Sequence, residues 1–126
     1  MVLDSSAIVA ILLEENGFEQ LADKVDTAPS VRVGAPALLE IRIVLTRKSS
    51  SQAKLQLFLE TIGAITIPFT AEHLVAAAEA HERFGKGRHA AKLNFGDCMS
   101  YAIARVAREP LLFTGDDFAK TDIEAA

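Results

Sequence analysis

The chain has 126 residues, half of them apolar, which suits one domain with a substantial buried core. Its formal net charge of -4 at pH 7 argues against binding to nucleic acid through overall charge, although a local basic patch stays open. One cysteine cannot form a disulfide within the chain, and the apolar run at 7–13 is too short to span a bilayer. We therefore expect a cytoplasmic protein with no membrane segment.

The first residues predict a strand that passes directly into a helix. The strand at 2–3 ends at Asp4, and Ser5 or Ser6 is expected to cap a helix over 7–13. Such a junction is half of a βαβ unit.

The next segment repeats this order. A helix over 18–25 precedes a strand at 31–33, and Pro36 then opens another helix. The apolar residues of that helix form two predicted stripes, namely Leu38, Ile41 and Leu45, and Leu39, Ile43 and Thr46. Glu40 is thereby left in mainly apolar company.

A polar break at 47–51 separates these elements from the C-terminal half, in which strands and helices alternate again. The predicted elements are a helix over 55–62, a strand at 64–67, a helix over 70–81, a helix over 93–107 and a strand at 111–113.

This alternation predicts an α/β fold, in which a central, mainly parallel sheet is sandwiched by helices. We expect residues 1–126 to form a single domain of this kind. Ligands of open α/β folds bind beyond the carboxyl ends of the strands. Asp4 follows the first strand, while Asp116 and Asp117 follow the last, so these acids are expected at one edge of the sheet.

The helix over 93–107 is apolar on nearly every side but carries Asp97 near its start. Asn94 is a good N-cap, and an acid in a first turn ordinarily stabilises the helix dipole. However, Asp4, Glu40 and Asp97 share one feature, since each lies in or beside an apolar segment without a basic residue three or four positions ahead. A buried charge of this kind requires compensation.

Carboxylates that gather at one site repel one another unless a hard cation compensates them, and oxygen ligands favour Mg²⁺ or Mn²⁺ over zinc. An acid-only magnesium site is typical of phosphodiester hydrolysis. Lys86 and Arg88 lie in a glycine-containing loop that either holds the phosphates of a nucleic acid or is an ordinary solvated loop. The residues alone thus favour hydrolysis of a nucleic-acid backbone.

Five motifs occur in a characteristic order along almost the whole chain. They are Val2-Leu3-Asp4-Ser5-Ser6-Ala7, Leu38-Leu39-Glu40-Ile41, Gly85-Lys86-Gly87-Arg88-His89, Leu93-Asn94-Phe95-Gly96-Asp97-Cys98 and Leu111-Leu112-Phe113-Thr114-Gly115-Asp116-Asp117-Phe118. Together they resemble the PIN-domain ribonucleases, specifically the VapC toxins of bacterial toxin–antitoxin pairs.

The resemblance implies a Mg²⁺- or Mn²⁺-dependent endoribonuclease that is inhibited by a cognate VapB-like antitoxin and forms a homodimer. It also implies that the catalytic and metal-binding residues are acids, with one member of the final pair completing the set. These residues are Asp4, Glu40, Asp97, Asp116 and Asp117. Metal-bound water is the expected nucleophile, because no histidine lies in an acidic motif.

Three further residues are candidates for contact with the RNA substrate. Ser6 is expected to support either Asp4 or a phosphate, while Lys86 and Arg88 are expected to bind the RNA backbone.

Other functions fit the sequence less well. A chain that resembled a response-regulator receiver would carry paired acids after its first strand, whereas Asp4 is followed by two serines here. Cys98 in an apolar helix is more typical of core packing than of redox or hydrolytic chemistry. The main alternative is a binding module, in which the PIN scaffold engages the antitoxin and catalysis is lost or conditional.

Overall fold

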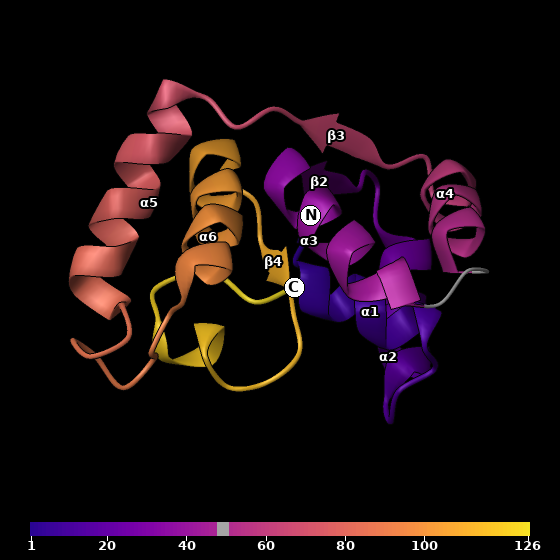
Figure 1. Cartoon of the computed structure of the whole chain (residues 1–126), viewed down its shortest axis with the longest axis horizontal. Helices are drawn as coiled ribbons and strands as arrows, with labels where there is room; N and C mark the ends of the chain where they lie inside the picture. Colours follow the sequence, from indigo (N-terminus) through magenta and orange to yellow (C-terminus); the bar gives the residue numbers. More distant parts are fainter. Residues whose placement is uncertain (48–50) are drawn as a thin grey trace.

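The computed structural model describes residues 1–47 and 51–126, in which strands and helices alternate (Figure 1). The strands are β1 (Val2–Leu3), β2 (Arg32–Gly34), β3 (Ile65–Ile67) and β4 (Leu111–Leu112). The helices are α1 (Ser5–Leu12), α2 (Phe18–Thr27), α3 (Ala35–Val44), α4 (Ser51–Thr61), α5 (Ala71–Phe84) and α6 (Phe95–Ala107), with 3-10 turns at Leu45–Arg47 and Phe118–Lys120. Residues 48–50 of the predicted polar break lie outside the described residues.

The four strands form one parallel sheet in the order β3-β2-β1-β4, which confirms the predicted α/β architecture. Val2 of β1 is paired with Arg32 on one side and Leu111 on the other. Because β1 is central, the residue that follows it emerges between the ends of β2 and β4. Asp4 occupies this position.

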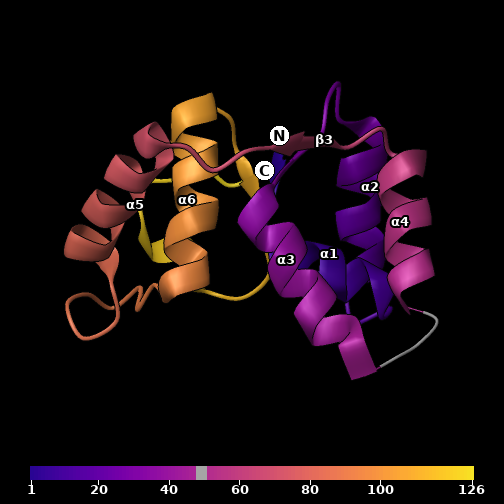
Figure 2. The ribbon, with the colours of Figure 1, turned by 45° about the horizontal axis from the view of Figure 1, so that its top comes forward.

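Helices cover both faces of the sheet, and a separate apolar core lies on each face (Figure 2). Side chains of successive strand residues point to opposite faces, so Val2 packs with α5 and α6 while Leu3 packs with α1 and α3. Leu111 and Leu112 divide between the two cores in the same way. The short strands are therefore buried on both sides, as parallel strands commonly are.

A close contact at Gly34 brings α3 against α6. A Cβ atom at Gly34 would lie 2.9 Å from Cγ1 of Ile103, which is buried in α6. Only glycine leaves room for this approach at the junction between β2 and α3. Glu40, in the second turn of α3, and Asp97, in the first turn of α6, are thereby held near the same end of the sheet.

One local prediction is wrong. The N-cap of α1 is Asp4 rather than Ser5 or Ser6, because the Asp4 carboxylate accepts a hydrogen bond from the backbone N–H of Ser6. The second apolar stripe of α3 is not buried, since Leu39 and Ile43 are 61% and 64% exposed. Only one face of α3 packs on the sheet, where Ile41 is fully buried, and the other face stands open.

The segment after β4 returns along the sheet and seals its edge. The N–H of Leu111 donates to the carbonyl of Glu124, and the N–H of Ala126 donates to the carbonyl of Leu111. The hydroxyl of Tyr101 donates to Asp122 at 2.6 Å, and Arg83 of α5 pairs with the same carboxylate at 2.9 Å. These contacts fasten the C-terminal segment to α5 and α6.

Within the described residues, none of the helices combines the length and apolarity that crossing a membrane demands.

Candidate active site

Asp4 is held at the carboxyl end of β1 by Ser6. Its side chain is 3% exposed and accepts hydrogen bonds from the Ser6 N–H at 3.0 Å and the Ser6 hydroxyl at 2.6 Å. The same hydroxyl accepts a hydrogen bond from the N–H of Thr114, which follows β4. The Ser6 hydroxyl therefore donates a hydrogen bond to Asp4 and links the ends of β1 and β4. This contact corresponds to the expected role of Ser6 in supporting Asp4.

Asp97 closes the first turn of α6. The N–H of Asn94 donates to Oδ2 of Asp97 at 2.8 Å, and the N–H of Asp97 donates to Oδ1 of Asn94 at 2.9 Å. This reciprocal pair is a capping box, so the ordinary role of an acid at a helix start is present here.

The environment of Asp97 disfavours its charge. Partial burial raises the pKa of this carboxyl, while the hydrogen bond from Asn94 opposes the rise. The negative charges of Asp4, Asp117 and Glu40 add to the effect, and the net pKa lies above the ordinary value of 3.8. Acids from four separate segments therefore act on one another electrostatically. Asp117 is the member of the final pair whose charge acts on Asp97.

Glu40 reaches this group from α3. A Cβ atom at Gly96 would lie 3.1 Å from Oε2 of Glu40 and 3.4 Å from its Oε1. The carboxylate of Glu40 thus lies directly against the first turn of α6, one residue before Asp97. The absence of a side chain at Gly96 makes this approach feasible.

The donor chemistry of the four acids fits a hard divalent cation, because every available ligand atom is an oxygen. Their mutual repulsion is the kind of unfavourable charge that such a cation offsets. Among residues 1–47 and 51–126, no group of three or more His, Cys, Asp and Glu side chains is already gathered closely enough to hold a metal ion. The four acids therefore lie near one another, but their side chains do not yet form a complete set of metal ligands.

The basic loop adjoins the same region. Lys86 and Arg88 are exposed, and they line one end of a groove of about 890 Å³ that runs between α5 and α6 to Asn94. The base of the loop is fastened by hydrogen bonds between the backbones of Lys86 and Leu93, and of Leu93 and Phe84. Two cations thus line the same groove as Asn94, the N-cap residue of the helix that carries Asp97.

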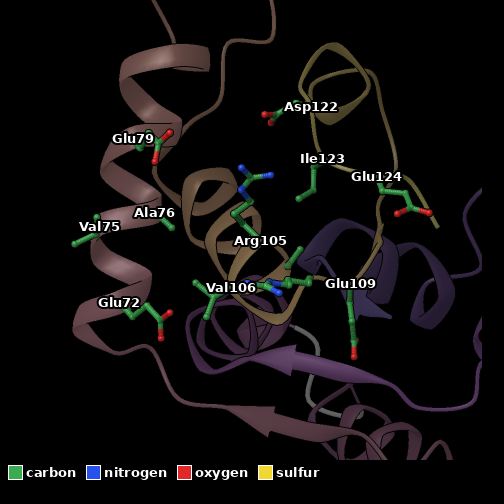
Figure 3. Close-up of a pocket in the computed structure, with 12 residues that line it drawn as sticks. Glu72, Val75, Ala76, Glu79, Arg105, Val106, Glu109, Asp122, Ile123 and Glu124 are labelled. Carbon is green, nitrogen blue, oxygen red and sulfur yellow. The ribbon is translucent and has the colours of Figure 1, made fainter.

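A different cavity, of about 830 Å³, lies between α5, the C-terminal end of α6 and the returning C-terminal segment (Figure 3). Arg105 points into it, and Glu109, which precedes β4, lines its wall. The cavity is therefore at the amino ends of the strands and contains none of the predicted site residues.

Solved structures share this architecture. A toxin–antitoxin complex from Klebsiella pneumoniae matches with a TM-score of 0.74 and 15% identity, covering 96% of this chain and 92% of that chain. VapBC2 from Rickettsia felis, solved bound to a DNA fragment from its promoter, matches with a TM-score of 0.78 and 14% identity, covering 99% and 96%. At these identities the likeness concerns the fold.

The family profile of the PIN domain matches residues 1–124, so fold and acidic edge together define a PIN-domain protein. Ribonuclease VapC36 of Mycobacterium tuberculosis (strain ATCC 25618 / H37Rv) is 42% identical over 127 residues, covering 98% of this chain and 91% of the relative. The chain belongs to the VapC ribonucleases, the PIN-domain toxins of toxin–antitoxin systems. The resemblance drawn from the five motifs is confirmed.

Proposed function

We propose that the chain is a Mg²⁺-dependent endoribonuclease toxin, with Mn²⁺ as a substitute, that hydrolyses RNA phosphodiester bonds at the carboxyl edge of its sheet. The proposed metal ligands are Asp4, Glu40, Asp97 and Asp117. The observation that supports this set is the raised pKa of Asp97, to which the charges of the other three acids contribute. A divalent cation bound there supplies positive charge to a phosphate oxygen and activates a water molecule.

The chain's own residues divide the remaining tasks. Ser6 and Asn94 fix the orientations of Asp4 and Asp97 through the hydrogen bonds described above. Lys86 and Arg88 bind backbone phosphates beside the acids, which concentrates a polyanion at a protein whose net charge is -4.

A matched pair of variants tests this assignment. Metal-free protein is incubated with RNA while Mg²⁺ is added stepwise, and cleavage is followed for wild type, Asp117→Asn and Asp116→Asn. We expect Asp117→Asn to lower the cleavage rate at least roughly 100-fold, because a ligand is lost, and Asp116→Asn to stay close to wild type.

The opposite ranking of the two variants would transfer the ligand role to Asp116. Cleavage that persists without added metal would contradict the metal assignment. If the folded wild-type protein cleaves no RNA at any Mg²⁺ concentration, the binding-module alternative takes its place.

We also propose that the chain binds a cognate VapB-like antitoxin. The toxin–antitoxin complex from Klebsiella pneumoniae, which has the same fold, supports this proposal. We place the protein in the cytoplasm, because its lone buried cysteine, its proposed RNA substrate and its proposed protein inhibitor fit that compartment. We also propose that residues 1–126 act as one domain.

We further propose a homodimer that forms through the open face of α3. Leu39, Ile43 and Val44 on this helix are 61%, 64% and 53% exposed. Neighbouring exposed apolar side chains of this kind mark protein interfaces. Because Glu40 lies on the same helix, a second copy would approach beside the acidic site.

A further inference from the structure

Phe95 is exposed to a degree that is unusual for an aromatic residue. It is the first residue of α6, directly after the cap residue Asn94, and it is 83% exposed. Among the phenylalanine and tyrosine side chains that the structure describes, it is the one that is largely exposed, whereas Tyr101 and Phe118 are 2% and 3% exposed. Core packing therefore does not explain this residue.

Phe95 lies between two grooves, both lined mainly by apolar side chains, that differ in the charged residues they contain. The groove of about 890 Å³ on one side contains Lys86 and Arg88 together with Glu82. The groove of about 750 Å³ on the other side contains Glu40 and borders the open face of α3 at Leu39, Ile43 and Val44. Phe95 lines both. The ring thus lies between the cations that suit RNA phosphates and the acids of the proposed catalytic site.

We propose that Phe95 stacks on an unpaired base of the RNA substrate, next to the phosphodiester bond that is cleaved. This inference rests on the proposed function and narrows its substrate to RNA segments that are single-stranded at the cleavage site. A base inside a duplex is already stacked on both faces, whereas an unpaired base has a face free for an aromatic ring. Cationic side chains beside an exposed ring are the combination that single-stranded nucleic acids require.

Charge favours RNA over a protein segment as the occupant of this groove. Lys86 and Arg88 at its end attract a polyanion, although the chain as a whole carries a net charge of -4. The wall of the groove is mainly apolar, but the two exposed cations at its end are a feature that a polyanion uses and an apolar protein segment does not.

Binding of a short single-stranded oligoribonucleotide to metal-free protein tests the proposal. The background carries Asp97→Asn so that the RNA stays intact, and fluorescence anisotropy measures the affinity at several salt concentrations. We expect Phe95→Ala to weaken binding about 5- to 150-fold, the range typical of one stacked base. The slope of affinity against salt should not change, because the substitution removes no charge.

Three companion measurements identify stacking. Phe95→Trp should retain wild-type affinity, while Phe95→Leu, which keeps apolar bulk but lacks an aromatic face, should bind as weakly as Phe95→Ala. Leu57→Ala removes a similarly exposed apolar side chain, 65% exposed on α4 and outside both grooves, and should leave RNA affinity unchanged. Binding of a fully paired RNA duplex should be insensitive to Phe95→Ala.

Several outcomes would overturn the proposal. A Phe95→Leu variant that binds as tightly as wild type, or an equal loss for duplex RNA, would assign Phe95 to non-specific apolar contact. Unchanged RNA affinity together with weaker self-association in sedimentation would assign it to a second copy of the chain. If wild-type protein cleaves RNA with Mg²⁺ while Phe95→Ala binds RNA normally, the stacking role alone fails. If wild-type protein neither binds nor cleaves RNA, the proposed function fails as well.

Discussion

At the scale of single residues, Asp97 performs two tasks with one carboxylate. Its Oδ2 atom completes the capping box with Asn94, and its charge is repelled by the acids around it. These two features have opposite effects on the pKa of Asp97. The hydrogen bond from Asn94 favours the ionised carboxylate, whereas burial and the neighbouring negative charges disfavour it. The net rise in pKa shows that burial and repulsion prevail.

We expect Asp97→Asn to abolish cleavage without weakening the fold. In metal-free wild-type protein the folded-state pKa lies above 3.8, so stability is fully present below that pH and falls as the pH rises through the raised pKa. The Asn side chain does not ionise and still offers an oxygen to the Asn94 N–H. Urea denaturation from acidic to neutral pH, with a chelator present, measures the free energy of unfolding. At neutral pH the value for the variant should match or exceed that of wild type. A deficit of equal size at every pH would mean that the cap dominates.

Tyr101 should titrate at an unusually high pH. Burial, followed by its hydrogen bond to Asp122, raises the pKa of this phenol from 10.0 to about 12. Because the folded-state pKa is raised, its contribution to stability is complete below pH 10.0 and is lost as the pH rises to about 12. The chain has one tyrosine and no tryptophan, so phenolate absorbance reports this group alone. A midpoint near 10.0 in folded protein would contradict the contact.

Asp122 offers an independent check on the same contact. Burial would raise the pKa of its carboxyl, but hydrogen bonds from Tyr101 and Arg83 outweigh burial and leave the pKa below 3.8. Tyr101→Phe removes one of these bonds and should move the Asp122 pKa upward, as measured by carboxyl NMR shifts against pH. Arg83→Ala, which removes the other bond, serves as a positive control for the direction of the shift.

At the scale of elements, the packing of α3 against α6 decides where Glu40 lies. We expect Gly96→Ala to displace Glu40, because the new Cβ would lie 3.1 Å from Oε2. Cleavage should fall while thermal stability is maintained or rises, since alanine is the better helix former by about 1 kcal/mol within a helix. The Mg²⁺ concentration for half-maximal cleavage should increase.

A matched substitution gives the control for Gly96→Ala. At Gly63, after α4, a Cβ atom would have no neighbour within 4 Å, but the φ of +59° makes alanine unfavourable there. Gly63→Ala should therefore lower stability and leave the metal dependence unchanged. Unchanged metal dependence in Gly96→Ala would show that Glu40 is not a ligand.

The alternation of strands and helices could be predicted from the sequence because it depends on local periodicity. Apolar runs such as 2–3 and 111–112 are buried on both faces, and helical spacing reveals the helices between them. The expected position of Asp4, Asp116 and Asp117 at one edge of the sheet then follows from the rule that sites form at the carboxyl ends of parallel strands.

Features that depend on contacts between distant residues could not be predicted. The exposed stripe with Leu39 and Ile43 is as periodic as the buried one, so periodicity alone cannot tell which stripe meets the sheet. The bond between Tyr101 and Asp122 joins residues 21 positions apart and leaves no pattern in the sequence. The sequence also cannot tell which of Asp116 and Asp117 faces Asp97, because the two neighbouring side chains are chemically identical.

At the scale of the whole molecule, the open face of α3 predicts self-association. Ile43→Glu places a charge at a side chain that is 64% exposed in the single chain and apolar in the proposed interface. We expect the dimer to weaken at least roughly 30-fold, as measured by sedimentation equilibrium. Leu57→Glu on α4 changes an equally exposed residue and should not affect association. Equal effects of both variants would remove α3 as the interface.

The charge distribution of the molecule predicts how RNA binding depends on salt. Replacing Lys86 and Arg88 together by alanine should weaken binding and flatten the plot of log affinity against log salt by about 1.4, since each phosphate contact contributes about 0.7 for single strands. Replacing Lys24 and Lys54, which lie on α2 and α4, gives the same change in net charge. A comparable flattening in this control would indicate attraction by overall charge.

The hydrogen bonds of Asp4 and Asp97 also determine when the conformational entropy of the site is lost. Ser6 and Asn94 immobilise these two side chains during folding. Among the described residues, the side chains of Glu40 and Asp117 form no hydrogen bonds and are exposed to solvent. Ordering a free side chain costs on the order of 1 kcal/mol, so the proposed cation would have this cost for two of its four ligands. In the proposed site, Asp4 and Asp97 would fix the position of the cation, and the exposed side chains of Glu40 and Asp117 would adapt to its size.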